Sequence, residues 1–365
     1  MTKNNEITDY VLKRITEDFH EDIALLLLYG SALNGTANSY SDVDLYFIPR
    51  TKRGYQLGET FILADIGYDF FGMTWERLTR IADFEDNLSP LVGDVQILFA
   101  HSSAEKRKFL HLQQQMTAHL TDRTYMHHRA LARLTSAKEI FFQLLQAHEL
   151  SAIRKFAGQL LMSIAEVCAY ENQTYFRKGL KEQFIDLKKM PKLPQNFLVT
   201  YQSIIKENNP AKIKADCQEI FFNTRQFLGL KEEQLQQVTA TSAAVRQDRV
   251  AASASSSDYL AAADWFQELI STFNKIYFCA TNKNYPLAFI SACALQTSLE
   301  EDLQIKLKTK DLLSTYQFDD LSVLAKRTKE IEEDCRYQIA ANQILLRDFS
   351  TMDELIQQKR KRLRN

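Results

Sequence analysis

The chain has 365 residues, and its 45 Lys and Arg residues nearly balance its 46 Asp and Glu residues, for a formal net charge of −1. This balance excludes a bulk electrostatic attraction to nucleic acid, and the length predicts two or three domains. The five cysteines are scattered without a C-x-x-C pair, which argues against a zinc site. Together with a polar N-terminus and no apolar run of about 18 residues, they predict a cytoplasmic protein without a membrane span.

The first elements in chain order are a helix and two strands. Residues 5–20 have the apolar spacing of a helix, and the apolar run 23–29 is typical of a buried strand. That run stops at Gly30-Ser31, where we expect one helical turn and then a loop. A second strand is predicted over residues 41–48.

Two carboxylates stand close together on this second strand. Asp42 and Asp44 are two residues apart, so a strand points both side chains to one face. Their mutual repulsion would raise one pKa and weaken the fold unless a cation lies between them. Hard oxygen ligands suit Mg²⁺. The pair therefore predicts a magnesium site.

Gly30 and Ser31 supply the second half of the predicted site. They lie where a strand gives way to a helix start, and backbone N–H groups at such a point attract phosphate. The missing side chain of Gly30 lets a phosphate approach the backbone closely. A phosphate cradle beside paired carboxylates is what nucleotidyl transfer requires.

These residues resemble a known family signature. Gly30-Ser31, ten intervening residues and Asp42-Val43-Asp44 are similar to the Gly-Ser-x10-Asp-x-Asp motif of the DNA polymerase β-like nucleotidyltransferases. The smaller bacterial branch, with the kanamycin nucleotidyltransferase-like and minimal nucleotidyltransferases, is the nearest match. The resemblance covers roughly the first hundred residues. It implies an α+β domain with a small mixed sheet over residues 1–102.

In this superfamily a third carboxylate comes from a strand next to the Asp-x-Asp strand. Residues 60–73 are rich in strand-forming residues, and Asp69 within them is our candidate. Asp65 is the alternative, but its place before Ile66-Gly67 fits a turn better. A short helix over 74–83, capped by Thr74, and a strand over 94–100 complete the predicted domain.

The rest of the chain is predicted to be helical. Seven of the ten glycines lie at or before Gly93, and apolar residues recur at three and four spacings beyond it. We expect a helical domain over 103–238 that closes the active cleft, a connector over 239–257 and a C-terminal helical region over 258–365. A helix over 151–176 carries Glu171, which the resemblance suggests as the acceptor's base, with Glu166 as the second candidate.

The predicted activity is Mg²⁺-dependent transfer of a nucleoside monophosphate from an NTP, expected to be ATP, to a hydroxyl. Asp42, Asp44 and Asp69 would hold two Mg²⁺ ions, and Gly30 and Ser31 would bind the triphosphate. The acceptor stays open: a small molecule such as an antibiotic ranks before a protein side chain, and RNA ranks last. The alternative is a non-catalytic module that senses nucleotide. A homodimer is left open.

Overall fold

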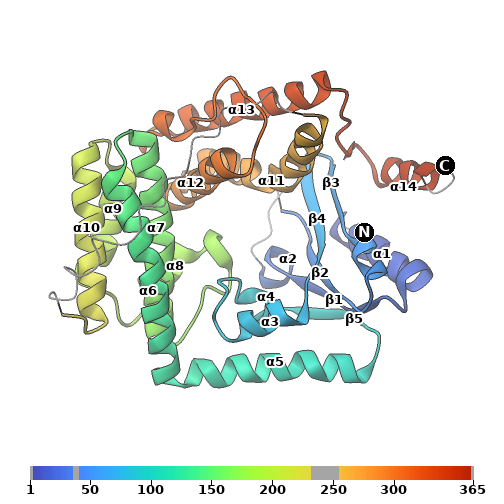
Figure 1. Cartoon of the computed structure of the whole chain (residues 1–365), viewed down its shortest axis with the longest axis horizontal. Coiled ribbons are helices and arrows are strands. Elements are labelled where there is room, and N and C mark those ends of the chain that lie inside the picture. The colour runs from blue at the N-terminus through green and yellow to red at the C-terminus, as the bar shows by residue number, and fades with distance from the viewer. Residues whose placement is uncertain (1–2, 36–40, 232–254, 363–365) are drawn as a thin grey trace.

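The computed structural model describes residues 3–35, 41–231 and 255–362, and it has the α+β architecture that the sequence predicts. A mixed sheet of six strands is built mainly from the first hundred residues, and helices make up most of the rest (Figure 1). The strands are β1 (Ile23–Tyr29), β2 (Asp44–Pro49), β3 (Glu59–Leu63), β4 (Ile66–Gly72), β5 (Gln96–Ala100) and β6 (Asp348–Phe349).

The strands lie in the order β5-β1-β2-β4-β3-β6. β1 runs antiparallel to both β2 and β5, and β3 runs antiparallel to β4. β2 and β4 are parallel, as are β3 and β6. The central position of β1 and β2 explains why both have apolar residues on each face: each must bury both sides of the sheet.

The two faces of the sheet enter different cores. On one face Leu26, Phe47 and Phe61 pack with Ile7 and other apolar residues of the N-terminal helix. On the other face side chains such as Leu25, Tyr46 and Ile62 join the large core of the helical region. The predicted first helix is α1 (Lys3–Arg14), followed by a turn of π-helix over Ile15–Phe19.

The run over 60–73 forms the hairpin β3-β4. Ala64 and Asp65 make its turn, both with positive φ (49° and 63°), a conformation required at both central positions of a type I′ turn. Asp65 therefore lies in the turn, as its sequence context predicts. Asp69 lies on β4, next to the strand that carries Asp44.

Helices surround the sheet and continue away from it (Figure 1). Thr74 caps α3 by accepting a hydrogen bond from the Arg77 N–H, as predicted. The helices are α2 (Ser31–Asn34), α3 (Trp75–Ala82), α4 (Pro90–Gly93), α5 (Ser103–Thr121), α6 (Arg123–Gln146), α7 (Leu150–Glu171), α8 (Gln183–Lys189), α9 (Phe197–Lys206), α10 (Pro210–Phe227), α11 (Ser256–Asn282), α12 (Tyr285–Glu301), α13 (Leu321–Ala341) and α14 (Met352–Arg362).

The C-terminal part of the chain returns to the sheet, which the sequence did not indicate. Helix α11 packs against β3 and β4: the side-chain amide of Asn274 donates to the Asp65 carbonyl at 2.9 Å. The short strand β6 extends the sheet beside β3. Helix α11 and strand β6, both within the predicted C-terminal region, are thus part of the wall around the sheet.

Most of the predicted connector, residues 239–254, lies outside the described residues. Its last residues begin α11, where Ser255 and Asp258 form a capping box. None of the described helices combines the length and the apolar composition needed to cross a bilayer.

Candidate active site

Gly30 and Asp44 lie in contact where β1 and β2 meet the helix α2. The two strands pair Tyr29 with Asp44, which brings the end of β1 against the start of β2. Gly30 has φ +75°, and a Cβ built on it would lie 2.0 Å from Asp44 Oδ2. The backbone N–H of Ser31 points at the same oxygen from 3.4 Å. Gly30 is therefore required first of all because the Asp44 carboxylate occupies the space of a side chain.

Ser31 contributes a second polar group that points into this corner. Its hydroxyl oxygen is buried and has no hydrogen-bond partner among the described residues. A buried hydroxyl without a partner carries a free-energy cost that a ligand oxygen can remove. The hydroxyl and the N–H of Ser31 together offer two donors beside Asp44.

Asp42 and Asp44 form a partly buried pair of carboxylates whose negative charges repel each other. Asp42 lies just before β2 rather than on it, a small departure from the expected strand bounds, and both side chains are half-buried. Burial raises the pKa of Asp42, and burial followed by the charge of Asp42 raises the pKa of Asp44 to about 7. Two carboxylates in this state favour a bound cation.

Asp69 lies on the neighbouring strand and belongs to the same electrostatic cluster. The parallel register pairs Leu45 with Phe70, which places Asp44 and Asp69 at the same level of adjacent strands. Burial raises the pKa of Asp69, and the charge of Asp69 in turn raises the pKa of Asp42. The Thr60 hydroxyl donates to Asp69 Oδ1 at 2.7 Å and orients the carboxylate.

Two lysines from distant parts of the chain face the carboxylates. The charges of Lys275, on α11, and Lys181, just before α8, both oppose the raised pKa values of Asp42 and Asp44. Lys181 Nζ lies 3.2 Å from the Ser41 hydroxyl. Burial, and then the charge of Lys275, lower the pKa of Lys181. The two cations repel each other, as expected at a place where an anion binds.

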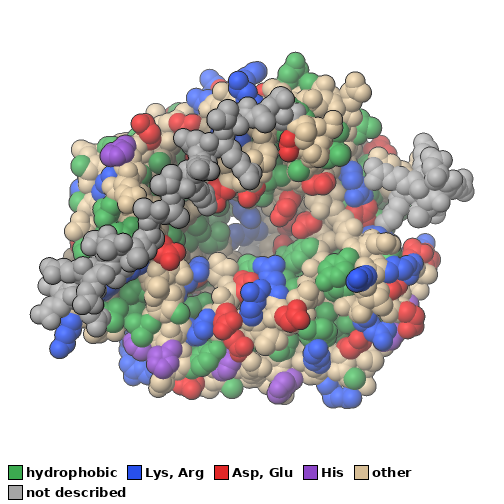
Figure 2. Space-filling view, in the orientation of Figure 1, with side chains coloured by type: hydrophobic (Ala, Val, Ile, Leu, Met, Phe, Trp, Pro, Cys, Tyr) green, Lys and Arg blue, Asp and Glu red, His purple; other side chains and the backbone are tan. Residues whose placement is uncertain are grey.

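All of these candidate site residues except Asp69 line one cavity of about 600 Å³ between the sheet and the helices. Figure 2 shows this face of the molecule hollowed at its centre, with basic and acidic side chains in the hollow. The volume is within the roughly 300–1,000 Å³ of small-molecule sites. Its wall includes Gly30, Ser31, Asp42, Asp44, Lys181 and Lys275, and aromatic residues such as Tyr29, Phe71, Tyr170 and Phe176.

One side of helix α7 forms part of the wall of this cavity, and Glu166 rather than Glu171 is among its lining residues. Glu171, our first choice for a base, instead pairs with His127, whose Nδ1 lies 2.5 Å from Glu171 Oε1. Glu166 contacts the guanidinium of Arg133, and burial raises the pKa of Glu166 to about 7. Glu166 is thus the α7 carboxylate that is positioned to meet a ligand in this cavity.

The residues present fit the Mg²⁺ that the motif implies. Asp42 and Asp44 offer hard oxygen donors, which Mg²⁺ prefers, and burial raises the pKa of both carboxylates, a cost that a bound cation would offset. Asp69 supplies a third carboxylate on the adjacent strand, but its oxygens do not lie within 4.8 Å of those of both Asp42 and Asp44, so the three would have to draw together around an ion. No cysteine or histidine is among the described residues that line the cavity, so the donor set does not favour zinc.

One curated protein is similar in sequence to part of this chain. The chain is 35% identical over 66 residues to a Methanocaldococcus jannaschii protein described as a putative protein adenylyltransferase. The match covers 18% of this chain and 45% of that protein, so the chain spans less than half of the relative's length. This match supports the nucleotidyltransferase superfamily. No protein-family model matches the chain.

A solved structure also carries the nucleotidyltransferase description. The crystal structure of a nucleotidyltransferase-like protein from Exiguobacterium sibiricum 255-15 aligns with 61% of this chain and 74% of its own, at 11% identity and a TM-score of 0.35.

Sequence reasoning about this candidate site missed its two lysines. Lys181 and Lys275 lie about 140 and 230 residues beyond the Asp-x-Asp motif, in a region of ordinary helical composition. In such a region a lysine is expected to be a solvent-exposed charge on a helix surface. Only the packing of α11 on the sheet brings Lys275 to Asp42. No signal in one sequence would have distinguished either lysine from its neighbours.

Proposed function

We propose that the chain transfers a nucleoside monophosphate from an NTP to a hydroxyl acceptor in this cavity. The observation that carries the proposal is the juxtaposition of Asp42 and Asp44, with raised pKa values, and the cations Lys181 and Lys275. The two partly buried carboxylates would be stabilised by a bound metal ion, and the two lysines beside them would be stabilised by a bound anion. A triphosphate with its metal ion supplies both charges. ATP is the proposed donor, because the matched M. jannaschii protein is described as an adenylyltransferase.

In this proposal Asp42, Asp44 and Asp69 hold Mg²⁺. When bound, the metal would offset charge on the phosphates and lower the pKa of the attacking hydroxyl. Lys181 and Lys275 bind phosphate oxygens of the triphosphate, and the Ser31 N–H and hydroxyl donate to a further oxygen. These fixed donors orient the α-phosphorus, and positioning of this kind is a large part of phosphoryl-transfer catalysis.

Glu166 is the proposed base. The acceptor oxygen forms a bond to the α-phosphorus while the bond from that phosphorus to the bridging oxygen of the pyrophosphate breaks. The hydroxyl proton passes to a Glu166 carboxylate oxygen, and pyrophosphate leaves with the electron pair of the broken bond. A pKa of about 7 keeps this carboxylate close to the value at which a base is most effective near neutral pH.

The charges of the cavity restrict the acceptor. Its described lining contains five basic side chains, Arg133, Arg177, Lys178, Lys181 and Lys275, against the three acids Asp42, Asp44 and Glu166. The two aspartates serve the metal, and Glu166 already meets Arg133. Among the described lining carboxylates only Glu166 is then left to face the acceptor, and its charge is offset by Arg133, which disfavours a polycation such as an aminoglycoside. A neutral or anionic small molecule, or a protein hydroxyl, fits the cavity better.

Labelled ATP tests the proposal. The purified chain is incubated with Mg²⁺ and either [α-³²P]ATP or [γ-³²P]ATP, together with acceptors that include small hydroxyl compounds and proteins. Transfer of the α label without the γ label is the expected result, and Asp44→Asn should abolish it. Transfer of the γ label would identify a kinase instead. Nucleotide binding without any transfer would favour the non-catalytic sensor.

A further inference from the structure

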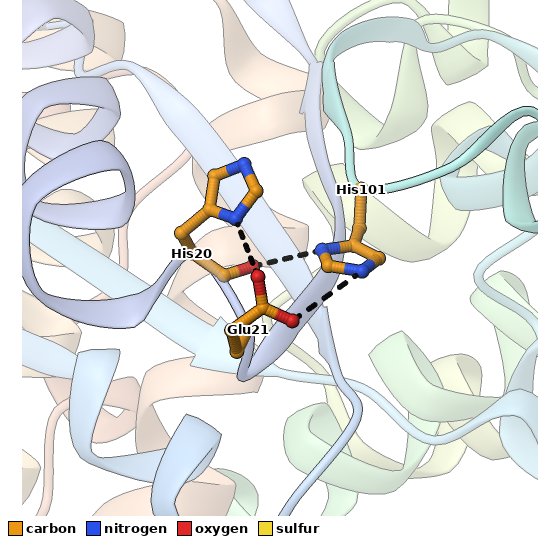
Figure 3. Close-up of side chains that lie close together, drawn as sticks. All are labelled: His20, Glu21 and His101. Carbon is orange, nitrogen blue, oxygen red and sulfur yellow. Dashed lines mark hydrogen bonds and ion pairs between the residues drawn. The ribbon is translucent and has the colours of Figure 1, made fainter.

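A second group of metal-binding side chains lies at the opposite end of the sheet. His20 and Glu21 lie three and two residues before the start of β1 at Ile23, and His101 directly follows β5. The two strands are antiparallel neighbours, so these ends meet (Figure 3). Asp44 pairs with Tyr29 at the other end of the seven-residue strand β1. At about 3.3 Å per residue the two places are roughly 20 Å apart.

The donor atoms of this group are spaced as ligands of one ion. His20 Nδ1 lies 3.0 Å from Glu21 Oε1, and His101 Nε2 lies 3.7 Å from Glu21 Oε2. One donor atom from each of the three residues fits within 4.8 Å of the others. Zinc bonds to nitrogen and carboxylate oxygen are about 2.0–2.2 Å, which places tetrahedral ligands about 3.4 Å apart. Only small side-chain movements separate the observed arrangement from that geometry.

The ring of His101 is held in the orientation that a metal ligand needs. Its Nδ1 lies 3.0 Å from the backbone carbonyl of His20, which can only accept a hydrogen bond, so Nδ1 carries the proton. Nε2 therefore presents its lone pair toward Glu21. A main-chain carbonyl that fixes the tautomer in this way is the usual outer partner of a metal-binding histidine.

A cation already occupies the space in front of this lone pair. Arg50 Nη1 lies 2.9 Å from His101 Nε2 and 3.6 Å from Glu21 Oε2. The same guanidinium has two further partners: Nη1 also donates to the Glu21 backbone carbonyl at 2.9 Å, and Nε lies 3.0 Å from Glu105 Oε1. Arg50 can therefore leave His101 and keep its pairing with Glu105. The arginine marks a point between an imidazole and a carboxylate where positive charge is favoured.

We propose that His20, Glu21 and His101 bind a divalent transition-metal ion, with Zn²⁺ the best fit, and that the ion replaces the Arg50 guanidinium. Two imidazoles and one carboxylate suit Zn²⁺ and not Mg²⁺, which prefers oxygen donors. His20, whose Nδ1 donates to Glu21 without the ion, adopts the other tautomer, which its exposed ring permits. Water completes the coordination. The ion ties the start of β1 to the end of β5.

Zinc titration of the full chain tests this site independently of nucleotidyl transfer. The protein is stripped with EDTA and saturated with Mg²⁺, so that Asp42 and Asp44 are not open to zinc. Isothermal titration calorimetry should then show one Zn²⁺ per chain, and the ion should raise the thermal midpoint by mass action. His101→Ala and His20→Ala should each lose this binding event. His20 is exposed, so its variant keeps the fold.

Two comparisons complete the test. His148→Ala and His111→Ala remove exposed histidines elsewhere on the chain and should leave the zinc stoichiometry unchanged. Arg50→Gln removes the competing guanidinium and should tighten zinc binding. A wild-type chain that binds no Zn²⁺, or a His20→Ala chain that binds as much as the wild type, would overturn the proposal.

Discussion

The carboxylate of Asp44 lies so close to Gly30 that a Cβ on the glycine would come within 2.0 Å of Asp44 Oδ2. This contact links the two halves of the Gly-Ser-x10-Asp-x-Asp motif directly. The glycine creates the space that the Asp44 carboxylate, a proposed metal ligand, fills, and the next residue points its N–H at the same carboxylate. The motif is therefore one packed unit rather than a phosphate loop and a separate metal pair.

Gly30→Ala should abolish activity, because the added methyl displaces the Asp44 carboxylate. The backbone also has φ +75° there, which costs of order 1–3 kcal/mol for a residue with a side chain. Gly35→Ala is the control, since Gly35 has the same φ but nothing within 4 Å of its Cβ position. It should lose some stability and keep Mg²⁺-dependent nucleotide binding. Equal binding by both variants, measured by calorimetry, would contradict the packing argument.

Asp44→Asn should remove transfer while stabilising the metal-free protein at pH 8. Burial and Asp42 raise the pKa of Asp44 to about 7. Because the folded state holds this proton more tightly, the stability of the metal-free wild type falls as pH rises from about 4 to about 7. The amide carries no charge and avoids that loss. Urea unfolding at pH 5 and pH 8, with and without Mg²⁺, checks this. Added Mg²⁺ should stabilise the wild type but not the variant.

Lys275→Ala should weaken nucleotide binding by about 10- to 100-fold, the value of one hydrogen bond to a charged group. The same change should restore the pKa of Lys181 toward its ordinary value, because Lys275 contributes to lowering it. Lys306→Ala, at an exposed position of the same region, is the matched control. Fluorescent-nucleotide titration measures both variants. If Lys275→Ala binds nucleotide as well as Lys306→Ala does, α11 does not belong to the site.

Glu166→Gln and Glu171→Gln should separate the two carboxylates of α7. Glu166→Gln should lower kcat by about 10²–10⁴-fold, the usual contribution of a positioned base, with nucleotide affinity nearly unchanged. Wild-type kcat should rise with pH through about 7, because the base must be deprotonated. The residual rate of the variant should lack that rise.

Glu171→Gln should leave kcat and its pH profile unchanged, because that residue pairs with His127 outside the cavity lining. The opposite outcome would identify Glu171 as the base. In that case kcat of Glu171→Gln would not depend on pH, and kcat of Glu166→Gln would rise with pH as in the wild type.

The sequence predicted the sheet well where local pattern decides the structure. The bounds of β1 and the turn at Asp65 follow from strand periodicity and turn chemistry, whereas the position of Asp69 beside the Asp-x-Asp strand was implied by the family resemblance. Helix α7 is a different case, because it is buried over most of its circumference. Its apolar stripe could not show which face lines the cavity, so Glu166 and Glu171 could not be distinguished.

Long-range contacts were also beyond the sequence. The strand β6 has only two residues, too few for a periodic pattern, and its pairing with β3 joins positions nearly 290 residues apart. The arrival of Lys275 at Asp42 depends on the packing of α11 on the sheet, including contact of Gly67 with Ile270. Such contacts depend on tertiary packing, which single-sequence patterns do not encode.

Binding of a non-hydrolysable nucleotide tests the central claim most directly. α,β-Methylene-ATP is titrated by calorimetry into the wild type and Asp44→Asn, each with Mg²⁺ and with EDTA. If Asp42, Asp44 and Asp69 hold metal for a triphosphate, the wild type binds tightly only with Mg²⁺, and the variant binds weakly in both conditions. Equal affinity in all four titrations would contradict the account, because the carboxylates would then have no part in nucleotide binding.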